Sequence, residues 1–208
     1  LMTFFEKLGN QVCSKQSYLC VGLDPVREKM PPHLPRTPEG LLEFLLEIVD
    51  ETKAYAVVFK PNFAYFEALG ASGMEVLQEL IRKIPAEIPV LGDAKRGDVG
   101  HSAEMYAKAV FETFECDAVT VTPYQGEDAL RPFLAYRERG VFVLCITSNP
   151  GAADFQLPEM HLQVAKKVKG WNVAGNAGLV VGATRPENIA AVRKNSGKMP
   201  FLIPGVGA

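Results

Sequence analysis

Short runs of apolar, largely β-branched residues recur along this 208-residue chain, and each run ends in a polar or turn-forming residue. The runs cover residues 19–25, 56–62, 90–96, 118–123, 141–148, 179–184 and 201–207. Strands that are apolar on both faces are typical of a parallel sheet covered by helices. The pattern therefore predicts seven strands of an α/β protein.

Helical periodicity fills the stretches between these runs. Apolar residues recur at spacings of three and four between Leu41 and Val49, and again between Met74 and Ile84. Crossovers of this length connect parallel strands in right-handed βαβ units. Both a closed barrel and an open doubly wound sheet fit this alternation.

The carboxyl ends of the runs favour the barrel. Polar side chains stand at or near these ends: Asp24, Lys60, Lys95, Thr122, Ser148 and Thr184. In a barrel these ends meet at one mouth, whereas an open sheet joins only the strands that flank its switch point. No Gly-x-Gly-x-x-Gly fingerprint follows the first run. We therefore predict a (β/α)8 TIM barrel.

Length and hydrophobic content indicate one domain. With 208 residues and 48% hydrophobic residues, the chain can bury a single core, and we expect one barrel domain over residues 1–208. A barrel of this type usually needs about 250 residues. Because the chain stops at the seventh run, we expect it to be C-terminally truncated, without the eighth strand and its helices.

Charge and hydropathy limit the kinds of partner that we expect the chain to bind. The 24 acidic and 22 basic residues give a net charge of -2, and no basic run indicates a nucleic-acid binder. No apolar stretch is long enough to cross a bilayer, and the first residues do not follow the pattern of a secretory signal. We expect a small-molecule substrate, no nucleic acid, no membrane and a cytoplasmic location.

Cysteine and histidine spacing argues against a metal site. The four cysteines form no Cys-x-x-Cys pair, and we expect them to be buried free thiols: Cys13, Cys20, Cys116 and Cys145. The three histidines are scattered, with no His-Glu-x-x-His arrangement. We therefore expect no bound metal.

The residues best suited to chemistry lie in the third run. Asp93 and Lys95 are two apart on a strand, so their side chains point the same way, and Asp98 follows in the loop. Lys60 ends the neighbouring second run. An alternating array of these four charges would keep both lysines protonated, as proton delivery to a carbanion requires. The alternative is a structural ion-pair network, but burying such charges is costly, which favours function.

Five motifs in order carry a specific resemblance. They are Val21-Gly22-Leu23-Asp24-Pro25, Phe59-Lys60-Pro61-Asn62, Gly92-Asp93-Ala94-Lys95-Arg96-Gly97-Asp98, Thr147-Ser148-Asn149-Pro150-Gly151 and Pro204-Gly205-Val206-Gly207. Along essentially its whole length the chain resembles the orotidine 5'-phosphate decarboxylases, in particular the bacterial branch with longer chains.

The resemblance implies an activity and a set of roles. The family converts orotidine 5'-monophosphate to uridine 5'-monophosphate in pyrimidine biosynthesis, without metal or organic cofactor. By resemblance, Asp24 and Lys60 bind the ribose hydroxyls, Asp93 faces the substrate carboxylate, and Lys95 protonates C6 after CO2 leaves. A fixed ammonium suits this step, because the C6 carbanion has no adjacent carbonyl or imine to delocalise it.

Further residues are implied to act across a dimer or on other parts of the substrate. Asp98 and Ser102 would reach the neighbouring subunit's site, which implies a homodimer with shared active sites. Ser148 and Pro150 belong to one loop, and the family places its serine against the pyrimidine, although the residues alone fit an ordinary turn equally well. A set of substrate-binding positions thus comprises Asp24, Ser102, Ser148, Pro150, Gly205 and Gly207.

The last two of these positions concern the phosphate. Backbone amides at Gly205 and Gly207 can approach an anion, and barrels commonly bind phosphate after strands seven and eight. In the family, a glutamine and an arginine at positions past Ala208 also hold the phosphate.

Other reactions on the same fold stay open. A Mg2+-dependent keto-sugar-phosphate decarboxylase or aldolase-type synthase would hold its metal with acidic strand ends, and Lys60 argues against it. A Schiff-base aldolase needs a lysine of depressed pKa, which flanking carboxylates oppose. A non-catalytic barrel is disfavoured by the intact set of charged residues.

Overall fold

The computed structural model describes residues 2–206 and divides into two compact units. The first unit contains the residues up to Ala94 together with Lys108–Val119, and the second contains Lys95–Ala107 and the residues from Thr120 onward. Gly207, one of the residues predicted to bind phosphate, lies outside the described residues.

All seven predicted strands are present. They are β1 (Leu19–Leu23), β2 (Ala56–Pro61), β3 (Leu91–Arg96), β4 (Ala118–Val121), β5 (Gly140–Ile146), β6 (Ala177–Val181) and β7 (Phe201–Leu202). Six of them end before the last residue of the predicted run, because that residue already lies beyond the strand. The largest difference is at β7, where the prediction extended to residue 207. Pro204 cannot donate to a ladder and Gly205 has a φ of +85°, so the strand stops early.

Helices alternate with the strands, as expected. They are α1 (Phe4–Lys15), η1 (Arg27–Lys29), α2 (Pro38–Thr52), α3 (Phe63–Glu67), α4 (Ala71–Lys83), α5 (Gly100–Lys108), the π-helical turn η2 (Ala109–Thr113), α6 (Glu127–Leu134), α7 (Ala152–Phe155), α8 (Met160–Trp171) and α9 (Pro186–Ser196). The two helical segments predicted from apolar spacing correspond to α2 and α4.

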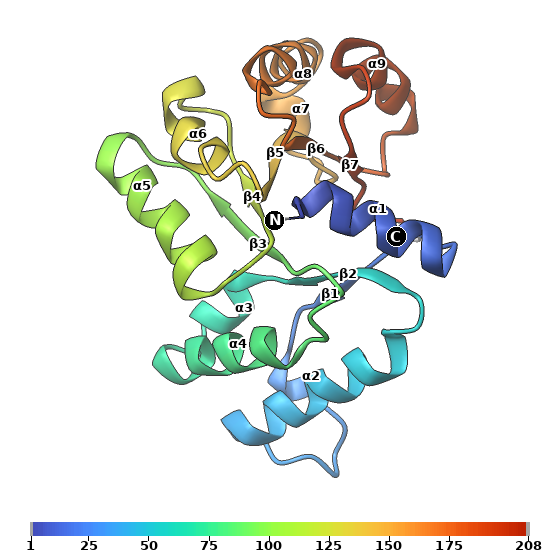
Figure 1. Cartoon of the computed structure of the whole chain (residues 1–208), viewed down its shortest axis with the longest axis vertical. Helices are drawn as coiled ribbons and strands as arrows, with labels where there is room; N and C mark the ends of the chain where they lie inside the picture. Colours follow the sequence, from blue (N-terminus) through green and yellow to red (C-terminus); the bar gives the residue numbers. More distant parts are fainter. Residues whose placement is uncertain (1, 207–208) are drawn as a thin grey trace. The chain divides into compact units, whose positions relative to one another are not determined.

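In the first unit, β1 and β2 pair in parallel with Gly22 opposite Lys60. Two isolated bridges extend the pairing from β2 towards β3, and one of them joins Asn62 to Asp93. The helices α2 and α4 lie next to each other beside these strands (Figure 1). They bury an apolar stripe each, which includes Leu41 and Leu77. The parallel pairing of β1 with β2 sets the register of their carboxyl ends.

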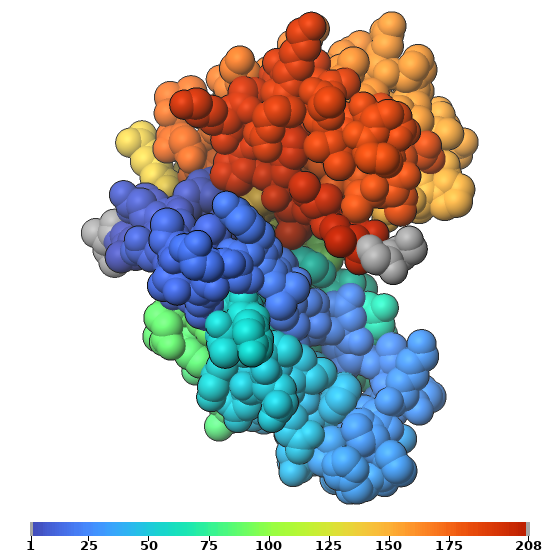
Figure 2. Space-filling model, turned by 90° about the vertical axis from the view of Figure 1, so that its right-hand side faces the viewer, coloured from blue at the N-terminus to red at the C-terminus, as the bar shows by residue number. Residues whose placement is uncertain are grey.

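In the second unit, the end of β3 belongs to a sheet whose strands follow the order of the chain, β3-β4-β5-β6-β7. The pairs β5-β6 and β6-β7 are parallel. The helices α8 and α9 lie side by side over this part of the chain (Figures 1 and 2). A strand order without reversal is that of a barrel, whereas a doubly wound sheet reverses its order at the switch point.

The four cysteines are free thiols, but they are not all buried. Cys116 and Cys145 are buried and Cys20 is half-buried, whereas Cys13 is exposed. The prediction of burial is wrong for Cys13, because this residue lies on α1, a helix in which Phe4 is the buried residue. Among the described residues, none of the helices has the length and apolar character needed to span a membrane.

Candidate active site

An ion pair between Lys60 and Asp93 forms the centre of the candidate site. Lys60 stands near the end of β2 and Asp93 on β3, and the Lys60 Nζ donates to Asp93 Oδ2 at 3.1 Å. Only 15% of the Lys60 side chain and 10% of the Asp93 side chain are exposed. Burial by itself would lower the pKa of Lys60, but Asp93 and Asp24 outweigh it and raise this pKa above its usual value. The ammonium is therefore charged at neutral pH.

Asp24 stands next to this pair and is contacted by Asn62. The Asn62 Nδ2 donates to Asp24 Oδ2 over a long 3.5 Å, while the Asn62 Oδ1 accepts from the backbone N–H of Ala64 at 3.3 Å. Asn62 thereby caps α3 and touches a candidate substrate-binding carboxylate with the same amide. From the sequence, Asn62 was named only as part of the motif Phe59-Lys60-Pro61-Asn62, and no role was predicted for it. Its position directly before a helix is the signal that could have identified it.

The face of β1 that bears Asp24 also carries Cys20 and Gly22. Burial raises the pKa of the Cys20 thiol to about 11; Lys60 opposes this shift, whereas Asp93 and Asp24 add to it. A Cβ on Gly22 would lie 3.5 Å from Asp24 Oδ1 and 4.0 Å from Lys60 Nζ. The absence of a side chain at Gly22 therefore leaves space beside both charged groups.

Lys95 and Asp98 belong to the second unit. Lys95 has a φ of +48°, in the left-handed region, and its N–H donates to the Thr120 hydroxyl at 3.0 Å. Lys95 is exposed to solvent. Asp98 follows β3 in a loop, where its Oδ1 accepts from the N–H of Val99 at 2.8 Å. The structure thus places the second lysine of the predicted array on a backbone turn at the end of β3.

Ser102 lies on α5, on a surface with few buried residues. Ser102 is exposed, and so are the apolar residues Val99, Met105 and Tyr106, with 51%, 47% and 38% of their surface accessible. The Arg96 guanidinium lies over the Tyr106 ring, 5.2 Å from its centroid. The segment around Asp98 therefore combines a carboxylate, a hydroxyl and uncovered apolar side chains.

Ser148 and Gly205 lie together in the second unit. The Thr184 hydroxyl donates to the carbonyl of Ser148 at 3.1 Å. A Cβ on Gly205 would be 3.7 Å from both Ser148 Cβ and Thr184 Cγ2. With its φ of +85°, Gly205 adopts a backbone conformation that other residues rarely take. Two predicted binding positions that are far apart in the sequence are thus neighbours.

The loop that contains Pro150 is closed by Gln156. The N–H of Thr147 donates to Gln156 Oε1 at 2.7 Å, and the Gln156 amide donates back to the Thr147 hydroxyl at 2.9 Å. The Thr147 hydroxyl donates to Asn149 Oδ1 at 2.6 Å. Pro150 is exposed within this closed loop. No motif pointed to Gln156, since its partner lies nine residues away.

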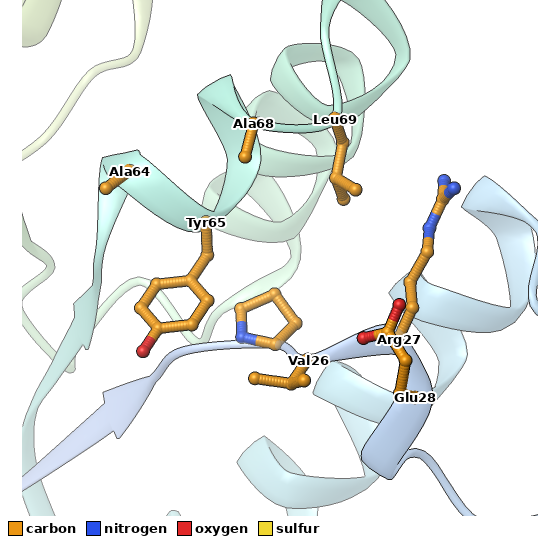
Figure 3. A pocket seen from close by; sticks show the side chains of 8 residues that line it. Val26, Arg27, Glu28, Ala64, Tyr65, Ala68 and Leu69 are labelled. Atoms are coloured by element: carbon orange, nitrogen blue, oxygen red, sulfur yellow. The ribbon is translucent and has the colours of Figure 1, made fainter.

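The first unit contains a cavity of about 380 Å³ between the segment that follows Asp24 and the α3 region. Its lining consists of Pro25, Val26, Arg27, Glu28, Ala64, Tyr65, Ala68 and Leu69 (Figure 3). None of the predicted site residues lines it. Within residues 2–206, no cluster of three His, Cys, Asp or Glu side chains is arranged to hold a metal ion.

Curated relatives match the chain over its full length. A protein named orotidine 5'-phosphate decarboxylase from Roseiflexus sp. is 48% identical over 214 residues, which cover 100% of this chain and 78% of the relative. A protein of the same name from Azoarcus sp. is 48% identical over 216 residues, with 100% of this chain and 79% of the relative covered.

Solved structures also match the chain. The orotidine monophosphate decarboxylase of Leishmania donovani superposes with a TM-score of 0.91 at 42% identity, covering 99% of this chain and 81% of that one. The UMP synthase of the same organism gives a TM-score of 0.92 at 43% identity, but this chain spans only 46% of it. These neighbours are TIM barrels, so the predicted fold class is confirmed.

The family description that matches residues 17–208 is orotidine 5'-phosphate decarboxylase / HUMPS. With this match, relatives at nearly half identity and the predicted motifs all in agreement, the chain belongs to the orotidine 5'-phosphate decarboxylase / HUMPS family.

Proposed function

We propose that the protein decarboxylates orotidine 5'-monophosphate to uridine 5'-monophosphate, the reaction named for its curated relatives. The observation that carries the proposal is the buried contact of Lys60 with Asp93 at 3.1 Å, beside Asp24. A buried ion pair is costly to maintain and is commonly found where chemistry requires it.

The chemical step breaks the bond between C6 of the pyrimidine and its carboxylate. The electron pair stays on C6, CO2 leaves, and the Lys95 ammonium delivers a proton to C6, after which solvent reprotonates the lysine. Fixed positive charge lowers the energy of a developing carbanion because it needs no reorganisation during the reaction. The other lysine, Lys60, is held protonated by its carboxylates and supports the same electrostatic role.

Charged side chains would contact the ribose and the departing group. In this proposal Asp24 and Lys60 bind the ribose hydroxyls, and Asp93 lies against the substrate carboxylate. The contact of two carboxylates raises the energy of the bound substrate relative to the transition state. The ion pair with Lys60 holds the Asp93 carboxylate at a defined place on β3.

Loop residues would bind the base and the phosphate. Ser148 is assigned to the pyrimidine, Pro150 to the substrate without a specified contact, and Gly205 to the phosphate, together with Gly207 outside the described residues. The left-handed Gly205 supports this role, because its bare backbone lets an anion approach the amides. Its proximity to Ser148 is consistent with contacts to one small ligand.

A homodimer with shared sites completes the proposal. Asp98 and Ser102 would contribute to the partner subunit's site. Support comes from the exposed apolar residues Val99, Met105 and Tyr106, which a second copy would cover. The free cysteines support a reducing, cytoplasmic compartment.

Loss of absorbance of orotidine 5'-monophosphate tests the function directly, with the full-length protein. We expect turnover that persists in EDTA, is abolished by Lys95→Ala and survives Lys83→Ala, a matched change at an exposed lysine of α4. A chelator-sensitive reaction would support the metal-dependent alternative instead, and borohydride trapping of a keto substrate would support a Schiff base. A folded wild type without turnover would contradict the proposal and leave a non-catalytic barrel as the remaining alternative.

A further inference from the structure

The backbone at Lys95 adopts an unfavourable conformation. Its φ of +48° lies in the left-handed region, where a non-glycine residue costs on the order of 1 kcal/mol or more. Gln16 and Glu115 are the other described non-glycine residues with positive φ. At Lys95 the turn falls at the end of a strand, so it changes the direction in which the side chain leaves the backbone. Such a conformation persists only where neighbouring groups hold it.

Two threonines of β4 and the following loop hold both sides of this turn. The Thr120 hydroxyl accepts from the N–H of Lys95 at 3.0 Å, and the N–H of Thr122 donates to the carbonyl of Arg96 at 2.8 Å. Gly97 then packs so closely that a Cβ there would overlap the Thr122 methyl group. The peptide unit before Lys95 and the one after Arg96 are thus tied to two threonines, one on β4 and one directly after it.

The contact to Thr120 differs in kind from an ordinary strand pairing. A strand N–H normally donates to a backbone carbonyl of its neighbour, whereas here the acceptor is a side-chain hydroxyl. Thr120 is 1% exposed, so water cannot replace the hydroxyl if it is removed. Without this acceptor, Lys95 would lower its backbone energy by relaxing towards the extended conformation. The direction of its Cα–Cβ bond would then change, and the ammonium would move with it.

We propose that Thr120 is a positioning residue for the reaction, because its hydroxyl holds Lys95 in the left-handed turn and thereby aims the ammonium at C6. The inference rests on the proposed function. It assigns Thr120 no contact with the substrate, so its effect should fall on the chemical step and leave substrate binding nearly unchanged.

Thr120→Val removes the hydroxyl at nearly constant size, and Thr120→Ser keeps it. We expect Thr120→Val to lower kcat about 100-fold, the loss typical of an ångström-scale misplacement. KM and the affinity for UMP, measured by calorimetry, should stay within about threefold of the wild type. Thr120→Ser should restore kcat to within about threefold, because its hydroxyl can accept the same bond.

Thr52→Val is the matched control, since the Thr52 hydroxyl bonds to the carbonyl of Ile48 within α2. It should keep the wild-type kcat. Thermal unfolding of each variant shows that the protein is folded. If Thr120→Val does not fold, Thr120→Cys replaces it, because sulfur keeps the size but accepts hydrogen bonds weakly.

Two results would overturn the inference: a kcat for the hydroxyl-free variant within threefold of the wild type, or a Ser variant as slow as the Val variant. Both leave the proposed function intact, since the wild type still turns over. A folded wild type that does not decarboxylate the nucleotide would instead contradict the function, and the inference with it.

Discussion

Lys60 shows how a buried charge is maintained by its neighbours. Its side chain is largely removed from water, which disfavours the ammonium, yet Asp93 and Asp24 more than compensate. Removing the lysine takes away an ammonium that offsets the charge of both carboxylates. Breaking a buried pair in this way is strongly destabilising, on the order of 3 kcal/mol.

The raised pKa of Lys60 predicts a specific pH dependence. The folded protein binds this proton more tightly than the unfolded chain, so the contribution is complete below the ordinary value of 10.5 and is lost as pH rises through the folded value. Lys60→Met should lower the unfolding free energy by about 3 kcal/mol at neutral pH. The difference in unfolding free energy between this variant and the wild type, measured by urea titration, should become smaller at strongly alkaline pH.

Lys29→Met, at an exposed lysine, serves as the control for this experiment and should change stability little at any pH. A gap between Lys60→Met and the wild type that widens with rising pH would contradict the assignment, because it would mean that the fold disfavours the ammonium.

The cysteines provide a second prediction at the residue scale. The thiol of Cys20 has a pKa raised to about 11, first by burial, and burial raises that of Cys145 to about 12. At about pH 8 a thiol of pKa 11 is ionised in roughly one molecule in a thousand. Iodoacetamide should therefore modify exposed Cys13 quickly and the other three only after unfolding, as followed by intact mass.

Cys13→Ser should abolish the fast modification. If Cys20 were instead modified as fast as Cys13, the face of β1 beside Lys60 and Asp93 would have to be more open and less negative than the structure indicates.

At the scale of elements, the start of α3 is tied to the candidate site by Asn62. The amide oxygen caps the helix, and the amide nitrogen contacts Asp24. The backbone N–H of Asn62 also donates to the carbonyl of Leu23 at 3.4 Å, which joins the end of β2 to that of β1. One residue therefore links two strand ends and a helix.

Substitutions at Asn62 should separate these roles. Asn62→Asp keeps an oxygen for the cap and removes the donor to Asp24, so we expect stability within about 0.5 kcal/mol of the wild type. It also adds a like charge, which should raise KM for the nucleotide about tenfold. Asn62→Ala removes both contacts and should cost about 1 kcal/mol of stability as well. Urea unfolding and steady-state kinetics measure the two effects.

Thr37→Ala is the matched control, since Thr37 caps α2 through the N–H of Gly40. It should lower stability by about 1 kcal/mol and leave KM unchanged. An Asn62→Asp protein with wild-type KM would restrict Asn62 to a structural role.

At the scale of the whole molecule, the proposed dimer predicts complementation. Lys95→Ala and Asp98→Asn should each be inactive alone. If Asp98 serves the partner subunit's site, a mixed dimer regains one intact site, and a fully exchanged equal mixture should reach about a quarter of wild-type activity. Mixing after mild denaturation and refolding, followed by the absorbance assay, measures this.

A mixture of Lys95→Ala with Lys60→Ala is the comparison, because both residues are assigned to their own subunit. It should stay inactive. A mixture with Asp98→Asn that also stays inactive, although sedimentation shows mixed dimers, would place Asp98 in its own subunit's site.

Most elements could be predicted from the sequence because burial leaves a local signature. Strands covered on both faces appear as continuous apolar runs, and all seven were found in this way. Their ends were less predictable. The run at residues 201–207 forms a strand of only two residues, since Pro204 and Gly205 turn the chain. The exposure of Cys13 was missed because its burial was inferred from the residue type, whereas packing decides which face of a helix is covered.

The sequence by itself determined the family, the strand positions and the charged residues at the strand ends, because each depends on residues close together in the chain. Tertiary structure decided which of these residues meet. The register that sets Gly22 opposite Lys60 and Asn62 opposite Asp93 brings a lysine to a carboxylate 33 residues away. The left-handed turn at Lys95, held by Thr120, likewise depends on packing between strands. Such contacts leave no local pattern, because the free energy that holds them comes from the whole packed unit.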